Sequence, residues 1–129
     1  MKIIGTGIDA VEIGRFEHAV KEKEEKFLQR IFTSEELKYI GTRKARFVHM
    51  AGRFAAKEAV KKALPDGARI GLSWADIEIL NNEDGKPYVR LHGEAEQLAK
   101  ENGPFEVLVS ISHTRNTAIS NAMVVKNGT

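Results

Sequence analysis

The longest helical segment of the sequence runs from Arg43 to Leu64 and decides which layer arrangements are possible. Its apolar residues recur at helical spacing and form one stripe: Phe47, Ala51, Phe54 and Ala55. Pro65 and Gly67 are expected to end the helix. A helix with one apolar stripe needs a second layer that covers the stripe.

The rest of the chain alternates between strand and helix patterns. β-Branched, partly alternating residues predict strands over 3–13, 77–80, 88–91, 105–112 and 118–125. Residues 15–30 predict one broken helix or two short ones, and residues 94–101 predict a short helix. Thr33 and Glu36 have capping-box spacing and begin a helix that ends near Gly41. The order β-ααα-ββ-α-ββ favours an α+β fold with a mainly antiparallel sheet packed against the long helix.

The length of 129 residues predicts a single domain, residues 1–129. The chain has no cysteine, which gives no support for a disulfide-built scaffold or a thiolate metal site. The first residues lack the apolar core of a signal peptide, and no run approaches the roughly 20 apolar residues of a membrane span. A cytoplasmic location is therefore expected.

The charge of the chain is balanced overall but uneven along it. With 20 basic and 18 acidic residues, the composition alone does not indicate a nucleic-acid-binding protein. Between Arg43 and Lys62 lie seven basic residues, interrupted only by Glu58. They are Arg43, Lys44, Arg46, Arg53, Lys57, Lys61 and Lys62. This concentration suits phosphates or an acidic protein, and the plain alternative is a solvated helix face.

Two acids stand out because each lies within an apolar pattern. Asp9 follows Gly5 and Gly7, which leave room for a close approach to the backbone; the alternative is a surface strand residue or a turn cap. Glu58 falls within the apolar stripe of the long helix, where a carboxylate is costly unless it is paired or binds a metal. The alternative for Glu58 is a salt bridge with Lys62, four residues later.

A convergence of Asp9 and Glu58, strand against helix, would create a site that suits Mg²⁺. This ion prefers few carboxylates together with waters and phosphate oxygens, and the neighbouring basic residues would complete a pyrophosphate pocket. The sequence contains neither a P-loop nor a dinucleotide fingerprint, and its histidines lack the spacing of zinc ligands. His113 ends a strand among Ser112, Thr114 and Arg115, where these side chains either gather round an anion or form a plain turn.

Several segments resemble motifs of the small, single-domain holo-acyl carrier protein synthases. They are residues 7–16 (GIDAVEIGRF), residues 52–59 (GRFAAKEA) followed by Lys62-Ala63-Leu64, and Ser112-His113-Thr114. Ser73-Trp74, Asp76-Ile77-Glu78 and Gly85-Lys86-Pro87 also match in order and spacing. The resemblance covers nearly the whole chain and implies a phosphopantetheinyl-transferase-like fold.

The resemblance also implies an activity. A magnesium-dependent transferase of this family moves the 4′-phosphopantetheine arm of coenzyme A onto a serine of acyl carrier protein, in fatty acid biosynthesis, and releases adenosine 3′,5′-bisphosphate. Asp9 and Glu58 match its magnesium ligands, Lys62 matches a lysine near the scissile pyrophosphate, and Arg15 matches a contact to the acidic carrier. The positions matching its coenzyme A phosphate contacts are Lys44, Arg53 and His113. A homotrimer with active sites between subunits is implied, although residues 116–129 depart most from the family pattern.

In the mechanism that this resemblance implies, the carrier serine attacks the β-phosphorus of coenzyme A. Lys62 stabilises or protonates the leaving phosphate, and Glu58 or a water molecule at the metal takes the serine proton. Basic residues of the segment 15–30 would steer the acidic carrier. Two alternatives remain open: a non-catalytic module whose basic helix 43–62 binds nucleic acid or another anion, and a structural protein in which Glu58 and Lys62 form only a salt bridge.

Overall fold

The computed structural model describes residues 1–41, 43–65 and 71–127, which form two antiparallel sheets and the helices that pack on them. The strands are β1 (Lys2–Glu12), β2 (Ile77–Asn81), β3 (Pro87–Leu91), β4 (Phe105–His113) and β5 (Thr117–Lys126). The helices are α1 (Ile13–Ile31), α2 (Ser34–Ile40), α3 (Arg46–Ala63) and α4 (Gly93–Asn102), with a short 3₁₀ helix η1 (Trp74–Asp76). The prediction of an α+β fold with antiparallel pairing around a long helix is confirmed.

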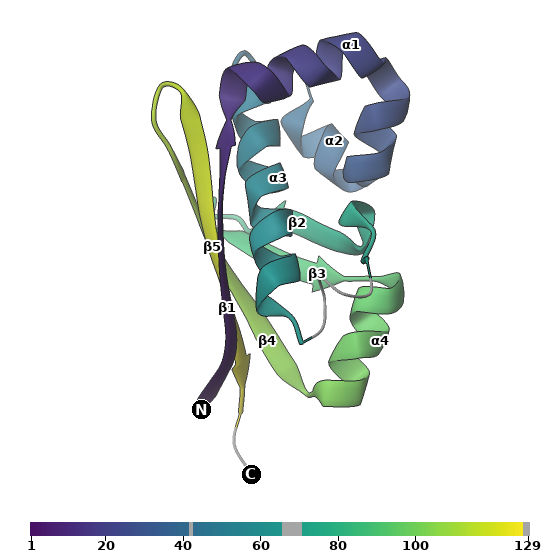
Figure 1. Cartoon of the computed structure of the whole chain (residues 1–129), viewed down its shortest axis with the longest axis vertical. Helices are drawn as coiled ribbons and strands as arrows, with labels where there is room; N and C mark the ends of the chain where they lie inside the picture. The colour runs from purple at the N-terminus through teal and green to yellow at the C-terminus, as the bar shows by residue number, and fades with distance from the viewer. Residues whose placement is uncertain (42, 66–70, 128–129) are drawn as a thin grey trace.

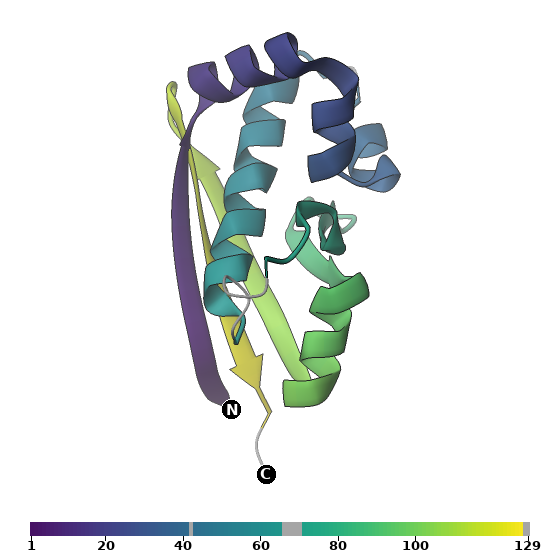
Figure 2. The same ribbon diagram turned by 45° about the vertical axis from the view of Figure 1, so that its right-hand side comes forward.

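Helix α3 lies at the centre of the arrangement. The larger sheet has the strand order β1-β5-β4, and α3 lies along one of its faces (Figures 1 and 2). The hairpin β2-β3 forms the second sheet, and β3 lies beside β4. Strands of both sheets therefore contact α3. Helix α1 crosses over the N-terminal end of α3, and α2 lies beneath it (Figure 1). Most of α3 is therefore buried, including Ala51, Ala55 and Ala59, each 0 % exposed.

The contact between β1 and α3 depends on two glycines. A Cβ atom added to Gly5 would lie 1.9 Å from the carbonyl oxygen of Ala63, and one added to Gly7 would lie 2.0 Å from that of Ala59. Because alternate residues of a strand share a face, Gly5, Gly7 and Asp9 all face the helix. The glycines thus let the backbones of β1 and α3 touch, and Asp9 continues the same row.

The predicted boundaries need two corrections. Helix α1 begins at Ile13, so the predicted strand over 3–13 extends too far and the predicted helix start at residue 15 is too late. Helix α1 is interrupted at Glu24 (φ 61°, ψ −153°), which confirms a broken helix, and the capping box of Thr33 and Glu36 is formed at the start of α2. Helix α3 begins at Arg46, so the predicted start at Arg43 is wrong. The amide and the Nε of Arg43 bond back to the carbonyl groups of Ile40 and Tyr39, which holds Arg43 in the connection after α2. Gly67 lies outside the described residues.

The second face of the larger sheet carries exposed apolar side chains. Ile8, Leu108 and Ile119 are 60 %, 48 % and 40 % exposed, one on each strand. They alternate along their strands with residues that face α3. None of the described helices covers this face, which we call the open face (Figure 2).

The glycine contact predicts a sharp difference between two Gly→Ala variants. Gly7→Ala should lower the free energy of unfolding by about 3 kcal/mol, because the new methyl group cannot fit without separating β1 from α3. Gly14→Ala is the matched control, since Gly14 lies in α1 with nothing within 4 Å of an added Cβ, and it should be neutral or slightly stabilising. Urea denaturation measures both, and equal effects would contradict the close packing.

Candidate functional site

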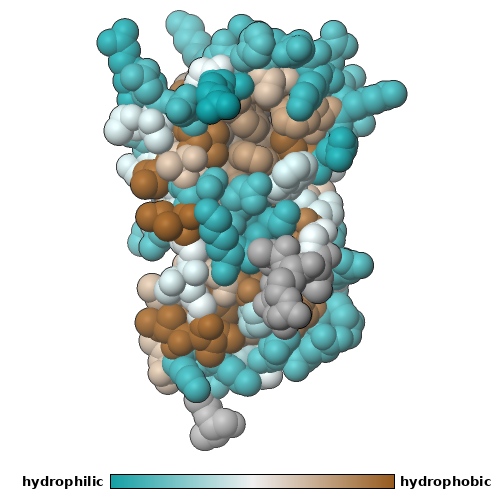
Figure 3. All heavy atoms as spheres, in the orientation of Figure 1, coloured by the Kyte–Doolittle hydropathy of each residue, from teal (hydrophilic) through white to brown (hydrophobic). Residues whose placement is uncertain are grey.

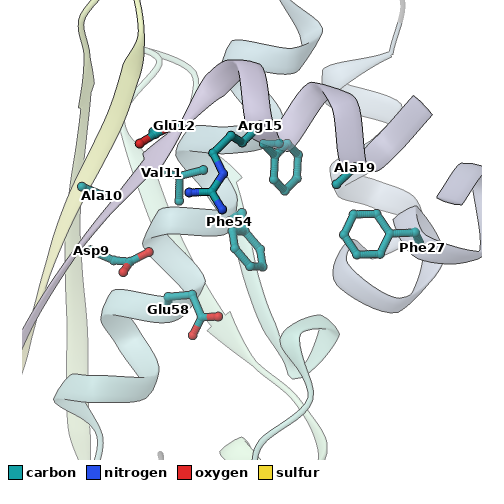
Figure 4. Close-up of a pocket in the computed structure, with 10 residues that line it drawn as sticks. Asp9, Ala10, Val11, Glu12, Arg15, Ala19, Phe27, Phe54 and Glu58 are labelled. Carbon is teal, nitrogen blue, oxygen red and sulfur yellow. The ribbon is translucent and has the colours of Figure 1, made fainter. Parts of the chain in front are cut away.

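A pocket of about 480 Å³ lies where β1, α1 and α3 meet. One wall is polar, with Asp9 from β1 and Glu58 from α3, and Arg15 of α1 reaches over it (Figure 4). The opposite wall is apolar and includes Phe16, Phe27 and Phe54. In the space-filling view apolar atoms show in a hollow beneath α1, with hydrophilic side chains around it (Figure 3). The predicted convergence of a strand acid and a helix acid is thus present in this pocket.

Asp9 is paired with a lysine from the neighbouring helix. The Nζ atom of Lys62 donates to the Oδ1 atom of Asp9 at 3.2 Å and to the carbonyl oxygen of Ile8 at 2.8 Å. The alternative pairing of Lys62 with Glu58 is not formed, because Lys62 turns towards β1. The Asp9 side chain is 22 % exposed and that of Lys62 is 53 % exposed, so both remain accessible to a ligand.

Glu58 differs from the sequence-based prediction in its depth. It is partly exposed in the pocket wall, so the prediction that it faces the core is wrong in that respect. Its Oε1 atom accepts a hydrogen bond from the Nε1 atom of Trp74 at 3.1 Å. The helix turns by about 100° per residue, which directs Glu58 to the pocket and the preceding Lys57 to the interior.

The fully buried charge of α3 is Lys57, which the sequence analysis missed as a distinct site. Its Nζ atom donates to Glu36 Oε1 at 2.7 Å and to the carbonyl oxygens of Ile77 and Trp74 at 2.6 and 3.1 Å. Both Lys57 and Glu36 are 0 % exposed. Burial lowers the pKa of Lys57, while the Glu36 carboxylate acts in the opposite direction. The available signal was the run of small residues between Ala51 and Ala63, which marks a helix buried on most sides.

Glu36 and Glu78 extend this buried network to the neighbouring elements. The Oε2 atom of Glu36 accepts from the amide of Ile79 at 2.9 Å, which ties α2 to β2. Glu78 accepts from the Thr33 hydroxyl and lies 2.9 Å from the Nε2 atom of His92. Burial acts to raise the pKa of Glu78, but the bonds from Thr33 and His92 outweigh burial and hold it below its usual value.

The residues expected to contact nucleotide phosphates lie outside the pocket of Asp9 and Glu58. Lys44 is exposed in the turn before α3, and His113 is exposed at the end of β4. Arg53 is only 4 % exposed; it bonds to Asn81, and its Nε atom has no hydrogen-bond partner among the described residues. Burial is the main reason that the pKa of Arg53 lies below its usual value.

His49, which the sequence analysis did not single out, lies among positively charged residues outside the pocket. Burial lowers its pKa, and the neighbouring charges of Arg53, Arg43 and His113 lower it further. These residues come from α3, from the connection before it and from β4. Positive charge contributed by separate elements, with Arg43 and His113 exposed and Arg53 buried, favours the binding of an anion.

The structure counts against a basic helix face that grips nucleic acid. Arg53 and Lys57 are buried, and Lys62 is engaged with Asp9. The basic residues of the segment 43–62 therefore point in different directions and do not form one exposed stripe.

Among the helices of residues 1–41, 43–65 and 71–127, none has the length and the apolar run needed to span a lipid bilayer.

Comparisons with known proteins agree on one family. Residues 5–120 match the 4′-phosphopantetheinyl transferase superfamily. The holo-[acyl-carrier-protein] synthase of Geotalea daltonii is 44 % identical over 96 % of this chain and 99 % of its own length. Among solved structures, the Neisseria meningitidis holo-[acyl-carrier-protein] synthase has a TM-score of 0.87 at 30 % identity, covering 97 % of this chain and 100 % of that chain. The Bacillus anthracis synthase, solved in complex with CoA (3′,5′-ADP), has a TM-score of 0.79 at 33 % identity, covering 97 % and 98 %.

The buried network predicts a strong loss of stability on removal of the Lys57 charge. Lys57→Met should lower the free energy of unfolding by about 3–5 kcal/mol, because Glu36 would be left as an unpaired buried charge. Lys100→Met is the matched control, because Lys100 pairs with Glu96 on an exposed helix surface at 3.8 Å and should cost less than about 1 kcal/mol. Urea denaturation compares the two.

A second variant isolates the ion pair from the volume of the lysine. Glu36→Gln combined with Lys57→Met should recover part of the stability that Lys57→Met loses, because no buried charge is then left unpaired. Equal stability of the Lys57→Met and Lys100→Met proteins would contradict the role of the pair.

Proposed function

Because the chain belongs to the 4′-phosphopantetheinyl transferase superfamily and is an enzyme of the holo-acyl carrier protein synthase type, we propose that it transfers the phosphopantetheine arm of coenzyme A to a serine of apo-acyl carrier protein. The products are the holo-carrier and adenosine 3′,5′-bisphosphate. The observation that carries the proposal is the pocket shared by Asp9 and Glu58, with Lys62 bonded to Asp9. The coenzyme A complex of the Bacillus anthracis relative supports the choice of donor.

The reaction is a displacement at phosphorus that needs positioning and charge stabilisation more than covalent help. The serine oxygen forms a bond to the β-phosphorus while the bond from that phosphorus to the bridging oxygen breaks. The bridging oxygen leaves with adenosine 3′,5′-bisphosphate, where Lys62 stabilises or protonates it. The serine proton passes to Glu58 or to water in the pocket.

Asp9 and Glu58 are the residues that would hold a magnesium ion. The described residues contain no cluster of three or more His, Cys, Asp or Glu side chains suited to a metal. Two carboxylates from separate elements fit Mg²⁺, because this ion keeps positions for water and for substrate phosphate oxygens. When bound, the ion supplies positive charge that stabilises the diphosphate of the substrate. The Nζ atom of Lys62 lies 3.2 Å from the Oδ1 atom of Asp9. It could turn to the diphosphate if the Asp9 carboxylate held the ion instead.

In this proposal, the adenosine end of coenzyme A binds to the cationic residues outside the pocket. Lys44, Arg53 and His113 are the proposed phosphate contacts, with His49 and Arg43 as their neighbours. Arg53 is fixed by Asn81 and lies 4.8 Å from the Tyr39 ring, so it would act mainly through a fixed positive charge. The exposed Lys44 and His113 are free to approach phosphate directly.

The carrier protein approaches over α1 in this proposal. Arg15 is exposed and lines the pocket, and the exposed basic residues Lys21, Lys23 and Lys26 follow on the same helix. Arg15 at the pocket and the exposed lysines of α1 would attract an acidic carrier and bring its serine to the two carboxylates. We assign residues 1–129 to one transferase domain that works in the cytoplasm.

We also propose that the open face of the larger sheet forms the contacts of a homotrimer. Ile8, Leu108 and Ile119 are exposed on this face although they are large and apolar. Asn121, where the family resemblance leads us to expect an apolar or acidic residue, pairs in register with Ile8 and accepts a hydrogen bond from Ser110. Its Oδ1 atom thus has a hydrogen-bond partner within the chain. Figure 3 shows hydrophobic side chains along the left edge, over the strands.

Transfer activity should depend on both carboxylates. Asp9→Ala and Glu58→Gln should stay folded and lose roughly 100-fold or more in transfer rate. Each variant removes a carboxylate that would hold the positive ion at the diphosphate. Mass spectrometry of apo-carrier mixed with coenzyme A, magnesium and enzyme detects the added phosphopantetheine. Glu94→Gln, at an exposed position on α4, should transfer at the wild-type rate. Wild-type rates in Asp9→Ala would exclude the proposed role of the pocket.

The trimer should dissociate when a charge is placed on the open face. Ile119→Lys should shift the mass measured by size-exclusion chromatography with light scattering from three chains to one, because the lysine would be desolvated at the interface. Tyr88→Lys is the matched control, since Tyr88 is also 40 % exposed but lies on β3, outside the larger sheet. A trimer that tolerates Ile119→Lys and yields to Tyr88→Lys would place the interface elsewhere.

A further inference from the structure

Trp74 is the only tryptophan of the chain, and it lies directly behind a carboxylate of the proposed active site. It belongs to η1, the short 3₁₀ helix before β2, and it is not among the residues that line the pocket of Asp9 and Glu58. Its indole Nε1 atom donates to Glu58 Oε1 at 3.1 Å. Trp74 therefore contacts Glu58 from outside that pocket; it is partly exposed and lines a neighbouring pocket together with Lys61 and Ser73.

The position of Trp74 is fixed from several directions. Its carbonyl oxygen accepts from the Nζ atom of the buried Lys57 at 3.1 Å. Its ring lies 5.5 Å from the Phe54 ring at an interplanar angle of 56°, and the Lys61 Nζ atom lies 5.3 Å from the ring centre. The indole N–H is thus held at a defined place by the main chain and by packing.

A fixed donor on one carboxylate oxygen limits how Glu58 can turn. A glutamate side chain on a helix surface samples several rotamers, and ordering it for a ligand has an entropic cost. The bond from Trp74 engages Oε1 and leaves Oε2 for another partner. Hydrogen bonds of this kind orient metal-binding side chains and tune their affinity for the ion.

We propose that Trp74 is a positioning residue that holds the Glu58 carboxylate ready to bind a divalent cation through its second oxygen. This inference rests on the proposed function, since Glu58 is a cation ligand only in that proposal. Lys57 and Glu36 contribute indirectly, because their buried pair fixes the main chain of η1. The competing explanation is that the ring of Trp74 only fills space beside Phe54.

The variant Trp74→Phe separates these two explanations, because phenylalanine keeps a ring against Phe54 but has no N–H group for Glu58. The concentration of Mg²⁺ that gives half of the maximal transfer rate should rise about tenfold, and saturating Mg²⁺ should restore most of the rate. Mn²⁺ titration followed by electron paramagnetic resonance, with coenzyme A present, should show the same weakening of binding. Tyr88→Phe removes a polar group from an exposed aromatic residue on β3 and should change neither value.

The fluorescence of Trp74 gives a second measurement that does not depend on the folding of that variant. The emission spectrum should differ between the wild type and Glu58→Ala, which removes the acceptor of the indole N–H. Asp9→Ala is the matched control, because Asp9 bonds to Lys62, and its emission should match the wild type. Mn²⁺ with coenzyme A should quench the wild-type emission, because the bound ion would lie next to the indole.

The outcomes distinguish this inference from the proposed function. If the wild type binds Mn²⁺ and transfers phosphopantetheine while Trp74→Phe shows the same metal dependence, Trp74 only packs and the inference is wrong. If Trp74→Phe unfolds, an emission spectrum that is the same in the wild type and Glu58→Ala overturns the inference. If the wild type neither binds Mn²⁺ with coenzyme A nor transfers the arm, the proposed function itself fails.

Discussion

The direct contact between the backbones of β1 and α3 determines where the core and the candidate site lie. Gly5 and Gly7 have no side chains, so the carbonyl groups of Ala63 and Ala59 lie against the strand. Asp9 is the next residue on the same face of β1, and Glu58 and Lys62 lie on the adjoining surface of α3. A bulkier strand would separate the two elements and with them the two carboxylates. The close packing therefore explains both the core of the molecule and the pocket at its edge.

A buried ion pair connects this packing to the remaining elements. Lys57 and Glu36 are fully buried, and their hydrogen bonds reach α2, β2 and η1. A buried ion pair contributes little net stability compared with apolar residues of the same size, because both charges lose their hydration. Its hydrogen bonds tie α2, β2 and η1 to α3. The proposed donor to Glu58, the indole of Trp74, is one of the groups whose main chain the pair holds.

Local signals in the sequence predicted the order of elements, because turn residues, β-branched runs and capping residues act over short distances. The capping box of Thr33 and Glu36 and the break in α1 are examples. The convergence of Asp9 and Glu58 was a hypothesis, because each acid interrupts an apolar pattern and the family resemblance implies that the two are ligands of one ion. The burial of individual side chains could not be predicted, because it depends on elements that are distant in the sequence. Glu58 was placed too deep, and the burial of Lys57 and Arg53 comes from α2 and from β2, including Asn81, which a helical wheel does not include.

We propose that Asp9 and Glu58 hold one divalent cation beside the diphosphate of coenzyme A. Crystals grown with Mn²⁺ and coenzyme A test it most directly, because anomalous scattering locates manganese without reference to the protein coordinates. We expect one strong anomalous peak, at a manganese ion that contacts both carboxylates and a phosphate oxygen of the bound coenzyme A. Coenzyme A bound with its diphosphate away from these carboxylates, or a manganese peak at other residues only, would contradict the claim.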